Sequence, residues 1–257
     1  MKLLNYMGGI SLFAAMLSFN ISAEASVAYN ITGWDDSGTG GVDGGFPANW
    51  IGASGPSYTG TLNAMWFADL AGNVTEIVSS TDARSKGAAS TFALAVGPRA
   101  WSSNATGTLG KGHGSDYGLI HLDSAANLII TVAADSALGS ALKSGFSLFQ
   151  GWDVGNTAVR VADYQNNQNN PLGTQGLTFL NSASTNIAGG LASFTFTGLS
   201  AGNYSLFVGG NATASVGSEG KYTVSLATSP VPVPSAVWLF GSALAGLMAT
   251  KRSKRTS

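Results

Sequence analysis

The segments NYSLFVGG (203–210) and KYTVSLAT (221–228) carry the pattern that decides the fold of this chain. In KYTVSLAT apolar or aromatic residues alternate with small or polar ones, and in both segments β-branched and aromatic side chains are frequent, as in strands. Glycine, asparagine and serine flank the segments, and these residues favour the turns that end strands. The pattern therefore predicts two β-strands near the C-terminal end of the folded part.

Runs rich in β-branched and aromatic residues recur upstream, and several of them alternate. These runs are TLNAMWFADL (61–70), STFALAV (90–96), NLIITVAAD (127–135), FSLFQGW (146–152) and ASFTFTGL (192–199). Outside the two ends, no segment of eleven or more residues has the i, i+3, i+4, i+7 apolar spacing of an amphipathic helix. We predict an all-β fold, an antiparallel β-sandwich or jelly roll of about ten to twelve strands.

Two polar stretches interrupt the strands. Residues 33–60 contain nine glycines among aspartates and serines and predict a long loop that bears Trp34 and Trp50. The sequence QNNQNNPLGTQG (165–176) predicts a second insertion.

The first 25 residues have the pattern of a secretory signal peptide. Lys2 precedes a mostly apolar stretch that continues to Phe19, and the sequence AEA at 23–25 supplies the small residues that signal peptidase requires. We predict a signal helix in 1–25 that is cleaved before Ser26. Signal peptidase is then a processing partner, and the chain is exported across the inner membrane.

The C-terminal segment has three consecutive parts. It reads VPVPS from Val231, then AVWLFGSALAGLMA (236–249) without a charge, then KRSKR (251–255). This order resembles the PEP-CTERM sorting signal, which exosortases cut in Gram-negative bacteria that make extracellular polysaccharide. The matching residues are Val231, Pro232, Val233, Pro234, Trp238, Leu239, Phe240 and Gly241, with valine at 233 in place of the usual glutamate, as in the VPLPA variant.

This resemblance implies that 230–257 form a sorting signal with a short hydrophobic helix and a basic end, processed by an exosortase. The apolar span has 14 residues, fewer than the roughly 20 that cross a bilayer, which favours a transient membrane segment. A plain C-terminal transmembrane anchor is the alternative.

The mature body is then 26–229, long enough for one sizeable domain. It holds seven basic and twelve acidic residues, a net charge of −5, and no cysteine. Stability outside the cytoplasm must therefore come from core burial rather than disulfides. Because no basic stripe lies in the body, we expect no nucleic-acid partner.

No catalytic arrangement is recognisable in the body, and we expect a non-enzymatic protein. The chain has no cysteine nucleophile, no G-x-S-x-G and no H-E-x-x-H motif. Residues 116–228 resemble bacterial prepeptidase C-terminal domains, through LSAGNYSLFVGG (199–210), GKYTVSLA (220–227) and the opening DYGL (116–119). The resemblance implies a β-sandwich without an active site.

The two histidines are candidate metal ligands. His113 lies in the glycine-flanked sequence GKGHGSD, and His121 lies in the predicted strand YGLIHLD, on the face shared by Tyr117, Leu119 and Asp123. This region, with Trp101 upstream and GFSLFQGWD (145–153) downstream, resembles CorA-type copper(I)-binding surface proteins of methanotrophic bacteria. The resemblance implies a copper site at His113 and His121. The alternative is one histidine in a turn and one packed on a strand.

Aromatic side chains offer a further candidate site. Trp34 and Trp50 in the glycine-rich loop are candidates for a platform that stacks on sugar rings, or for an apolar anchor of that loop. Trp66 and Trp152 lie in apolar runs and are expected in the core.

Together these features favour a secreted, exosortase-processed, non-enzymatic protein of the cell surface or extracellular matrix, associated with exopolysaccharide and without a cofactor. A copper(I)-binding surface protein that uses His113 and His121 is the first alternative. A carbohydrate-binding module is the second.

Overall fold

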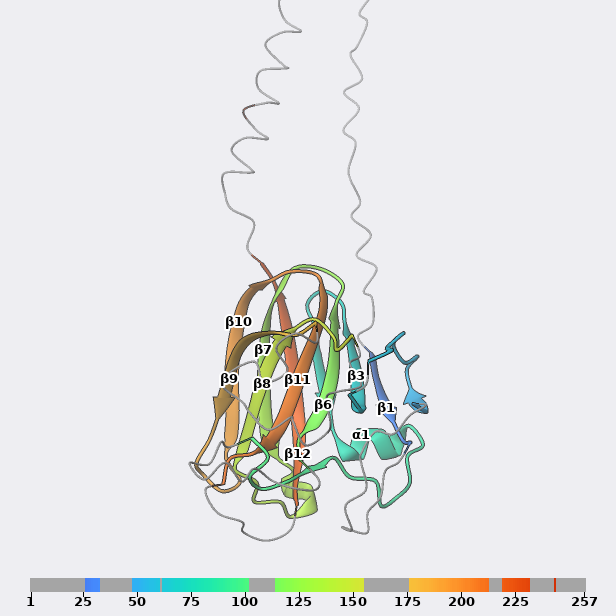
Figure 1. The fold of residues 1–257 in the computed structure, drawn as a ribbon, viewed down its shortest axis with the longest axis vertical. Helices are drawn as coiled ribbons and strands as arrows, with labels where there is room; N and C mark the ends of the chain where they lie inside the picture. Colours follow the sequence, from blue (N-terminus) through green and yellow to red (C-terminus); the bar gives the residue numbers. More distant parts are fainter. Residues whose placement is uncertain are drawn as a thin grey trace, which may run out of the picture.

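The computed structural model confirms the all-β sandwich (Figure 1). It describes residues 26–32, 48–60, 62–101, 114–154, 176–212, 219–231 and 243. The predicted signal helix in 1–25 and the predicted C-terminal hydrophobic helix lie outside these residues, apart from Ala243. Among the described residues, no helix is both long and apolar enough to span a bilayer.

The larger sheet has seven strands. Their order is β2 (Trp50–Gly52), β1 (Ser26–Asn30), β3 (Ala64–Leu70), β6 (Asp116–Leu122), β11 (Gly202–Gly210), β8 (Ser144–Gln150) and β9 (Thr178–Ser184). All neighbours are antiparallel except β3 and β6, which run parallel. This parallel pair is possible because the chain crosses to the other sheet between the two strands, a connection that a parallel arrangement requires.

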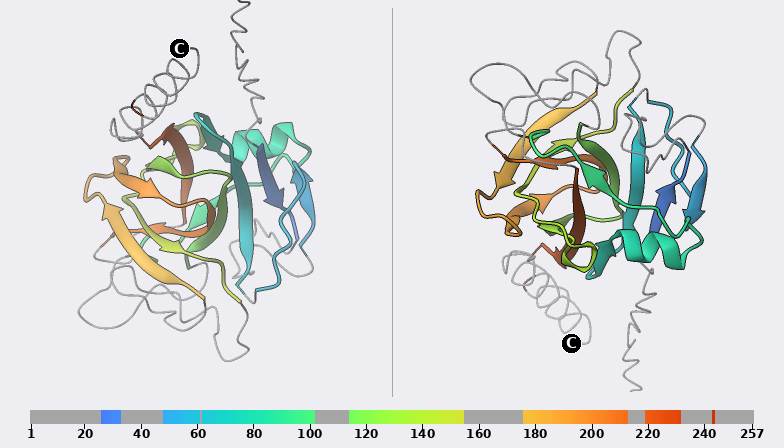
Figure 2. Two further views of the ribbon diagram at one scale, coloured as in Figure 1. Left: turned by 90° about the horizontal axis from the view of Figure 1, so that it is seen from above. Right: turned by 90° about the horizontal axis from the view of Figure 1, so that it is seen from below.

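The smaller sheet has the order β10 (Leu191–Leu199), β7 (Ala126–Ala134), β12 (Gly220–Pro230) and β4 (Thr75–Val78), and β5 (Ala95–Val96) pairs with the start of β12. Helix α1 (Ser80–Ser85) and the short 3-10 helix η1 (Ser136–Leu138) lie in connections. Strands from before and after residue 116 contribute to both sheets, so all the described strands build one sandwich (Figure 2).

The predicted strand at 90–96 is regular only at its end, in β5. Its side chains Phe92 and Leu94 are nevertheless buried. The Phe92 carbonyl accepts from the guanidinium of Arg84, and the Leu94 amide donates to Ser80 Oγ. Side chains of the α1 region thus satisfy backbone groups that a strand partner would otherwise satisfy.

The main core fills the space between the two sheets. At its centre Trp66 donates from Nε1 to the Tyr222 hydroxyl at 3.2 Å, and Tyr222 donates to Asp116 Oδ2 at 2.6 Å. All three side chains are buried. Gly118, on the strand beside Trp66, leaves room for the indole, because a β-carbon there would lie 2.0 Å from Trp66 Cζ2.

A second apolar cluster covers the outer face of the seven-stranded sheet. Its buried members are Ala28, Leu62, Ala64, Phe67, Tyr117, Leu119, Phe149, Leu177 and Phe207, and Trp50, Ala53, Tyr58, Trp152 and Phe179 pack against it partly buried. This sheet therefore buries apolar side chains on both faces, which explains why strands such as AMWFADL alternate poorly in the sequence.

Candidate metal centre

A row of polar side chains crosses the larger sheet beside the second apolar cluster. Asp69 on β3 is in register with His121 on β6, and His121 is in register with Asn203 on β11. Residues two positions away, Phe67 and Leu119, belong to the outer cluster. Because side chains alternate between the faces of a strand, Asp69, His121 and Asn203 stand on the same outer face.

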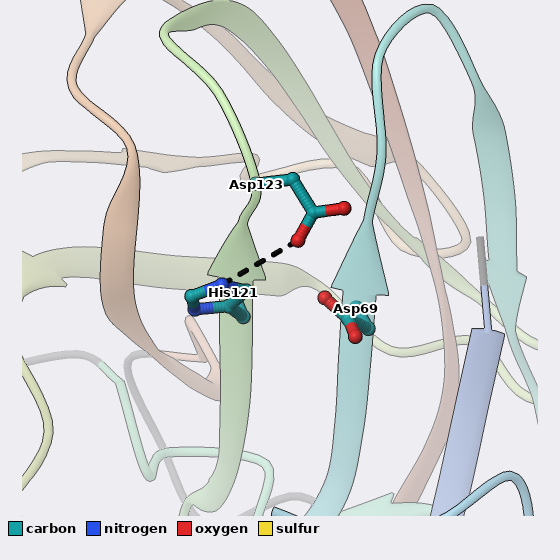
Figure 3. Close-up of side chains that lie close together, drawn as sticks. All are labelled: Asp69, His121 and Asp123. Carbon is teal, nitrogen blue, oxygen red and sulfur yellow. Dashed lines mark ion pairs between the residues drawn. The ribbon is translucent and has the colours of Figure 1, made fainter. Parts of the chain in front are cut away.

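Asp123 completes the group from the turn after β6. Its backbone amide donates to the Leu70 carbonyl at 3.2 Å, which fixes the turn against β3. Its Oδ1 atom lies 3.5 Å from His121 Nε2. Ligand atoms of Asp69, His121 and Asp123 all lie within 4.8 Å of one another (Figure 3). Three potential metal ligands, from β3, from β6 and from the turn after β6, thus lie close together.

Asp69 is the most constrained member of the group. Its Oδ1 atom is buried and has no hydrogen-bond partner in the described part of the chain. Burial raises the pKa of the Asp69 carboxyl, the negative charge of Asp123 raises it further, and His121 opposes the shift. Two carboxylates held this close, one of them incompletely solvated, favour the approach of a cation.

Asn203 orients the histidine. Its Oδ1 atom lies 2.8 Å from His121 Nδ1. With the carboxamide oxygen facing the ring, Nδ1 is the donor, and in the neutral imidazole the lone pair is then on Nε2. That lone pair is on the side of Asp123, and the two side chains are 37% and 46% exposed. The histidine is therefore held in the tautomer that binds a metal through Nε2, with access from solvent.

Trp152 lies over the backbone next to this row. Its Nε1 donates to the Tyr204 carbonyl at 2.9 Å and to the Ile120 carbonyl at 3.3 Å. Its ring meets Phe67 edge to face, with centroids 5.9 Å apart. Residues 120 and 204 are the chain neighbours of His121 and Asn203, so the indole holds the two strands that carry the row. Trp152, which the sequence predicts in the core, packs partly buried against the second apolar cluster.

The sequence identified His121 and its shared face with Tyr117, Leu119 and Asp123, but not Asp69 or Asn203. The available signal for Asp69 was one acid in the otherwise apolar run AMWFADL. His113 lies outside the described residues, so its sharing a site with His121 stays a prediction.

The remaining predicted site residues fall as follows. Trp34 lies outside the described part, and so does the sorting motif except Val231. Trp50 is half-buried against the second cluster, and a β-carbon at Gly55 would lie 2.1 Å from its Cδ1 atom. Its indole is therefore packed by its own loop, and a role in stacking on sugars stays a prediction.

No protein-family model and no curated protein matches the sequence. Among solved structures, the chain is similar to CorA, a surface-associated copper-binding protein of Methylomicrobium album BG8, with 14% identity over 55% of this chain and 92% of that one and a TM-score of 0.37. It is similar to the pre-peptidase C-terminal domain of a Bacillus anthracis collagenase, with 16% identity over 63% and 92% and a TM-score of 0.28. It is also similar to the secreted protein MopE of Methylococcus capsulatus, in which an oxidized tryptophan facilitates copper binding, with 12% identity over 54% and 83% and a TM-score of 0.33. At these values we draw nothing about the site from them.

Proposed function

We propose that this protein is an exported, non-enzymatic β-sandwich protein that binds one divalent transition-metal ion, copper(II) in first place, at Asp69, His121 and Asp123. The observation that carries the proposal is the convergence of one imidazole and two carboxylates within 4.8 Å. Clusters of exposed acidic side chains are also common in proteins that hold no metal ion, so the cluster alone is not sufficient. Here Asn203 also holds His121 through Nδ1, and one carboxylate oxygen is buried without a hydrogen-bond partner among the described residues.

The chemical type of the ligand atoms decides which oxidation state of copper the site prefers. Copper(I) prefers soft thiolate and thioether ligands together with imidazole, whereas mixed nitrogen and oxygen ligands suit copper(II). The candidate centre offers one nitrogen and carboxylate oxygens, and the chain has no cysteine. Among divalent first-row ions copper(II) binds such sites most tightly, and zinc follows as the next candidate. The copper(I) alternative requires His113 as a second nitrogen donor.

Each residue has a distinct part in binding. His121 supplies Nε2, and Asp69 and Asp123 supply oxygens and neutralise the charge of the ion. Asn203 holds the imidazole through Nδ1, as the outer partners of metal-binding histidines do. With about a third to a half of the His121 and Asp123 side chains exposed, the ion exchanges directly with solvent.

The two terminal segments support the location. A cleavable leader and a PEP-CTERM-like tail favour a surface or extracellular-matrix protein that signal peptidase and an exosortase process. A metal site in a matrix rich in polysaccharide would retain metal ions near the cell. Association with exopolysaccharide is part of this proposal.

The test is titration of the exported protein with Cu²⁺ and Zn²⁺, by calorimetry and by electron paramagnetic resonance for copper. We expect one equivalent of copper(II) with one imidazole nitrogen in the spectrum. His121→Ala should abolish stoichiometric binding, and Asp69→Asn and Asp123→Asn should each weaken it. His113→Ala is the matched control, since it removes the chain's other imidazole, and it should bind like wild type.

Two results would overturn the proposal. One is the absence of stoichiometric metal in the wild-type protein. The other is unchanged binding in His121→Ala. Equal losses in His113→Ala and His121→Ala would instead support the two-histidine copper site.

A further inference from the structure

The polar row extends one strand further, to the first described residue. Ser26 on β1 is in register with Asp69 on β3. Ala28, two residues on, belongs to the outer cluster, whereas Val27 and Tyr29 belong to the main core. Since side chains alternate along a strand, Ser26 stands on the same outer face as Asp69 and His121.

The backbone nitrogen of Ser26 faces Asp69. The Val27 carbonyl accepts from the Ala53 amide, and the Ile31 amide donates to the Asn49 carbonyl, so the odd-numbered residues of this segment direct their backbone groups toward the β2 side. Backbone groups of successive strand residues point to opposite sides. The nitrogen of Ser26 therefore points toward the backbone of Asp69 on β3, with the two paired α-carbons about 5.5 Å apart if the pair is hydrogen-bonded. An α-ammonium group at this position has more than one N–H, so it can also donate to the Asp69 carboxylate on the outer face.

This position coincides with the predicted cleavage site of the leader. Cleavage between Ala25 and Ser26 converts the backbone amide nitrogen of Ser26 into an α-ammonium group. We infer that this ammonium group is the charge partner of the Asp69 carboxylate, so that removal of the leader completes the polar site on the outer face of the sheet.

The Asp69 carboxylate has an oxygen available for such a partner. Its Oδ1 atom is buried without a hydrogen bond in the described part of the chain, and Asp123 adds a second negative charge nearby. Lys86, the described cation that contacts β1, is already engaged. Its Nζ atom lies 2.7 Å from Asp82 Oδ2 and 3.1 Å from the Val27 carbonyl oxygen. In the uncut chain a neutral amide occupies the position of the ammonium group.

The pairing does not depend on metal binding and exists in the metal-free protein. Only its expected effect on metal binding rests on the proposed function. An ammonium group bound to one oxygen of Asp69 leaves the other oxygen for the metal, so the amine orients this ligand as Asn203 orients His121. The uncut chain would lack that orientation.

The test is a double-mutant cycle between the amine and the carboxylate in the metal-free exported protein. The amine is blocked by selective acetylation near neutral pH, and the N-terminus is verified by mass spectrometry. Acetylation should lower the Tm of the wild-type protein by about 1–3 °C, the range for a partly exposed ion pair in a domain of this size. It should leave the Tm of Asp69→Asn unchanged, and the wild-type shift should shrink at high salt.

Asp123→Asn is the matched control. It removes the same charge from the same group, but Asp123 lies in the turn after β6 and is not paired with β1, so acetylation should still lower its Tm. A second variant inserts one glycine between Ala25 and Ser26. It moves the cleaved amine outward by about 3.3 Å and should reproduce the effect of acetylation without chemical modification.

The inference fails if the exported protein begins at a residue other than Ser26, or if acetylation shifts wild type and Asp69→Asn equally. Both results are independent of metal binding. A protein that shows the amine–Asp69 coupling but binds no copper or zinc would overturn the proposed function alone.

Discussion

His121 Nδ1 lies 2.8 Å from Asn203 Oδ1, across the neighbouring strands β6 and β11. The two residues are 82 positions apart in the chain. The contact leaves Nε2 as the open coordination atom of the only described histidine in the candidate centre.

Asn203→Ala should therefore weaken copper(II) binding by roughly 10–100-fold, because the ring loses the partner that fixes its tautomer and orientation. Asn203→Asp, which keeps an accepting oxygen at the same place, should restore most of the affinity. Calorimetric titration measures both. Because the side chain is at the sheet surface, the unfolding free energy should change little, and equal affinities in wild type and Asn203→Ala would refute the orienting role.

Gly118 and Trp66 are predicted to be coupled in stability. A methyl group at Gly118 would overlap the indole, so Gly118→Ala should destabilise the fold by about 3 kcal/mol. Trp66→Phe removes the overlapping ring atoms, so the double variant should be less destabilised than the sum of the two single variants. Urea denaturation measures all three. Strict additivity would show that the clash is relieved elsewhere.

Tyr222→Phe should destabilise the protein by roughly 2 kcal/mol. The substitution removes a 2.6 Å hydrogen bond to the buried carboxylate of Asp116 and leaves Trp66 Nε1 without this acceptor. Circular dichroism during urea unfolding gives the value. Tyr58→Phe is a suitable control, because Tyr58 is only partly buried. A cost below about 0.5 kcal/mol would mean that other contacts of Asp116 are sufficient.

Alkaline pH should unfold the protein through buried tyrosines. Burial raises the pKa of the Tyr29 and Tyr117 hydroxyls well above the ordinary value. The unfolded chain ionises near pH 10 while the folded chain does not, so stability is full below about pH 10 and falls as the pH rises further. Denaturant titrations from pH 8 upward measure the slope. Tyr117→Phe should be less stable than wild type at pH 8 but should lose less stability above pH 10. If its unfolding free energy falls with pH as steeply as that of wild type, Tyr117 does not contribute to the alkaline unfolding.

Processing at both ends is tested by intact-mass measurement of the exported protein. We expect loss of residues 1–25 and of the apolar tail within 230–257. A species that begins at Ser26 but retains 236–249 would leave the plain membrane anchor in place of the sorting signal.

The sequence by itself determined the fold class and part of the site. Alternation in segments such as KYTVSLAT is a local property, because one residue faces the core and the next faces solvent, and it predicted β12 and its class correctly. The same local rule placed His121 on one face with Tyr117 and Leu119. It was less successful at 90–96, where only 95–96 form a strand and side chains of the α1 region satisfy the Phe92 carbonyl and the Leu94 amide.

Only the tertiary structure decided which polar residues meet. Asp69 lies beside His121 because β3 and β6 pair in parallel after the chain has crossed to the other sheet. Asn203 lies on the other side of His121 because β11, a strand much later in the sequence, pairs with β6. Strand order and register depend on how all the apolar faces are buried together, including the second cluster on the outer face. A short segment does not determine strand order or register. Its side-chain period of two specifies which face of the sheet a residue occupies, but not which residue lies beside it on the neighbouring strand.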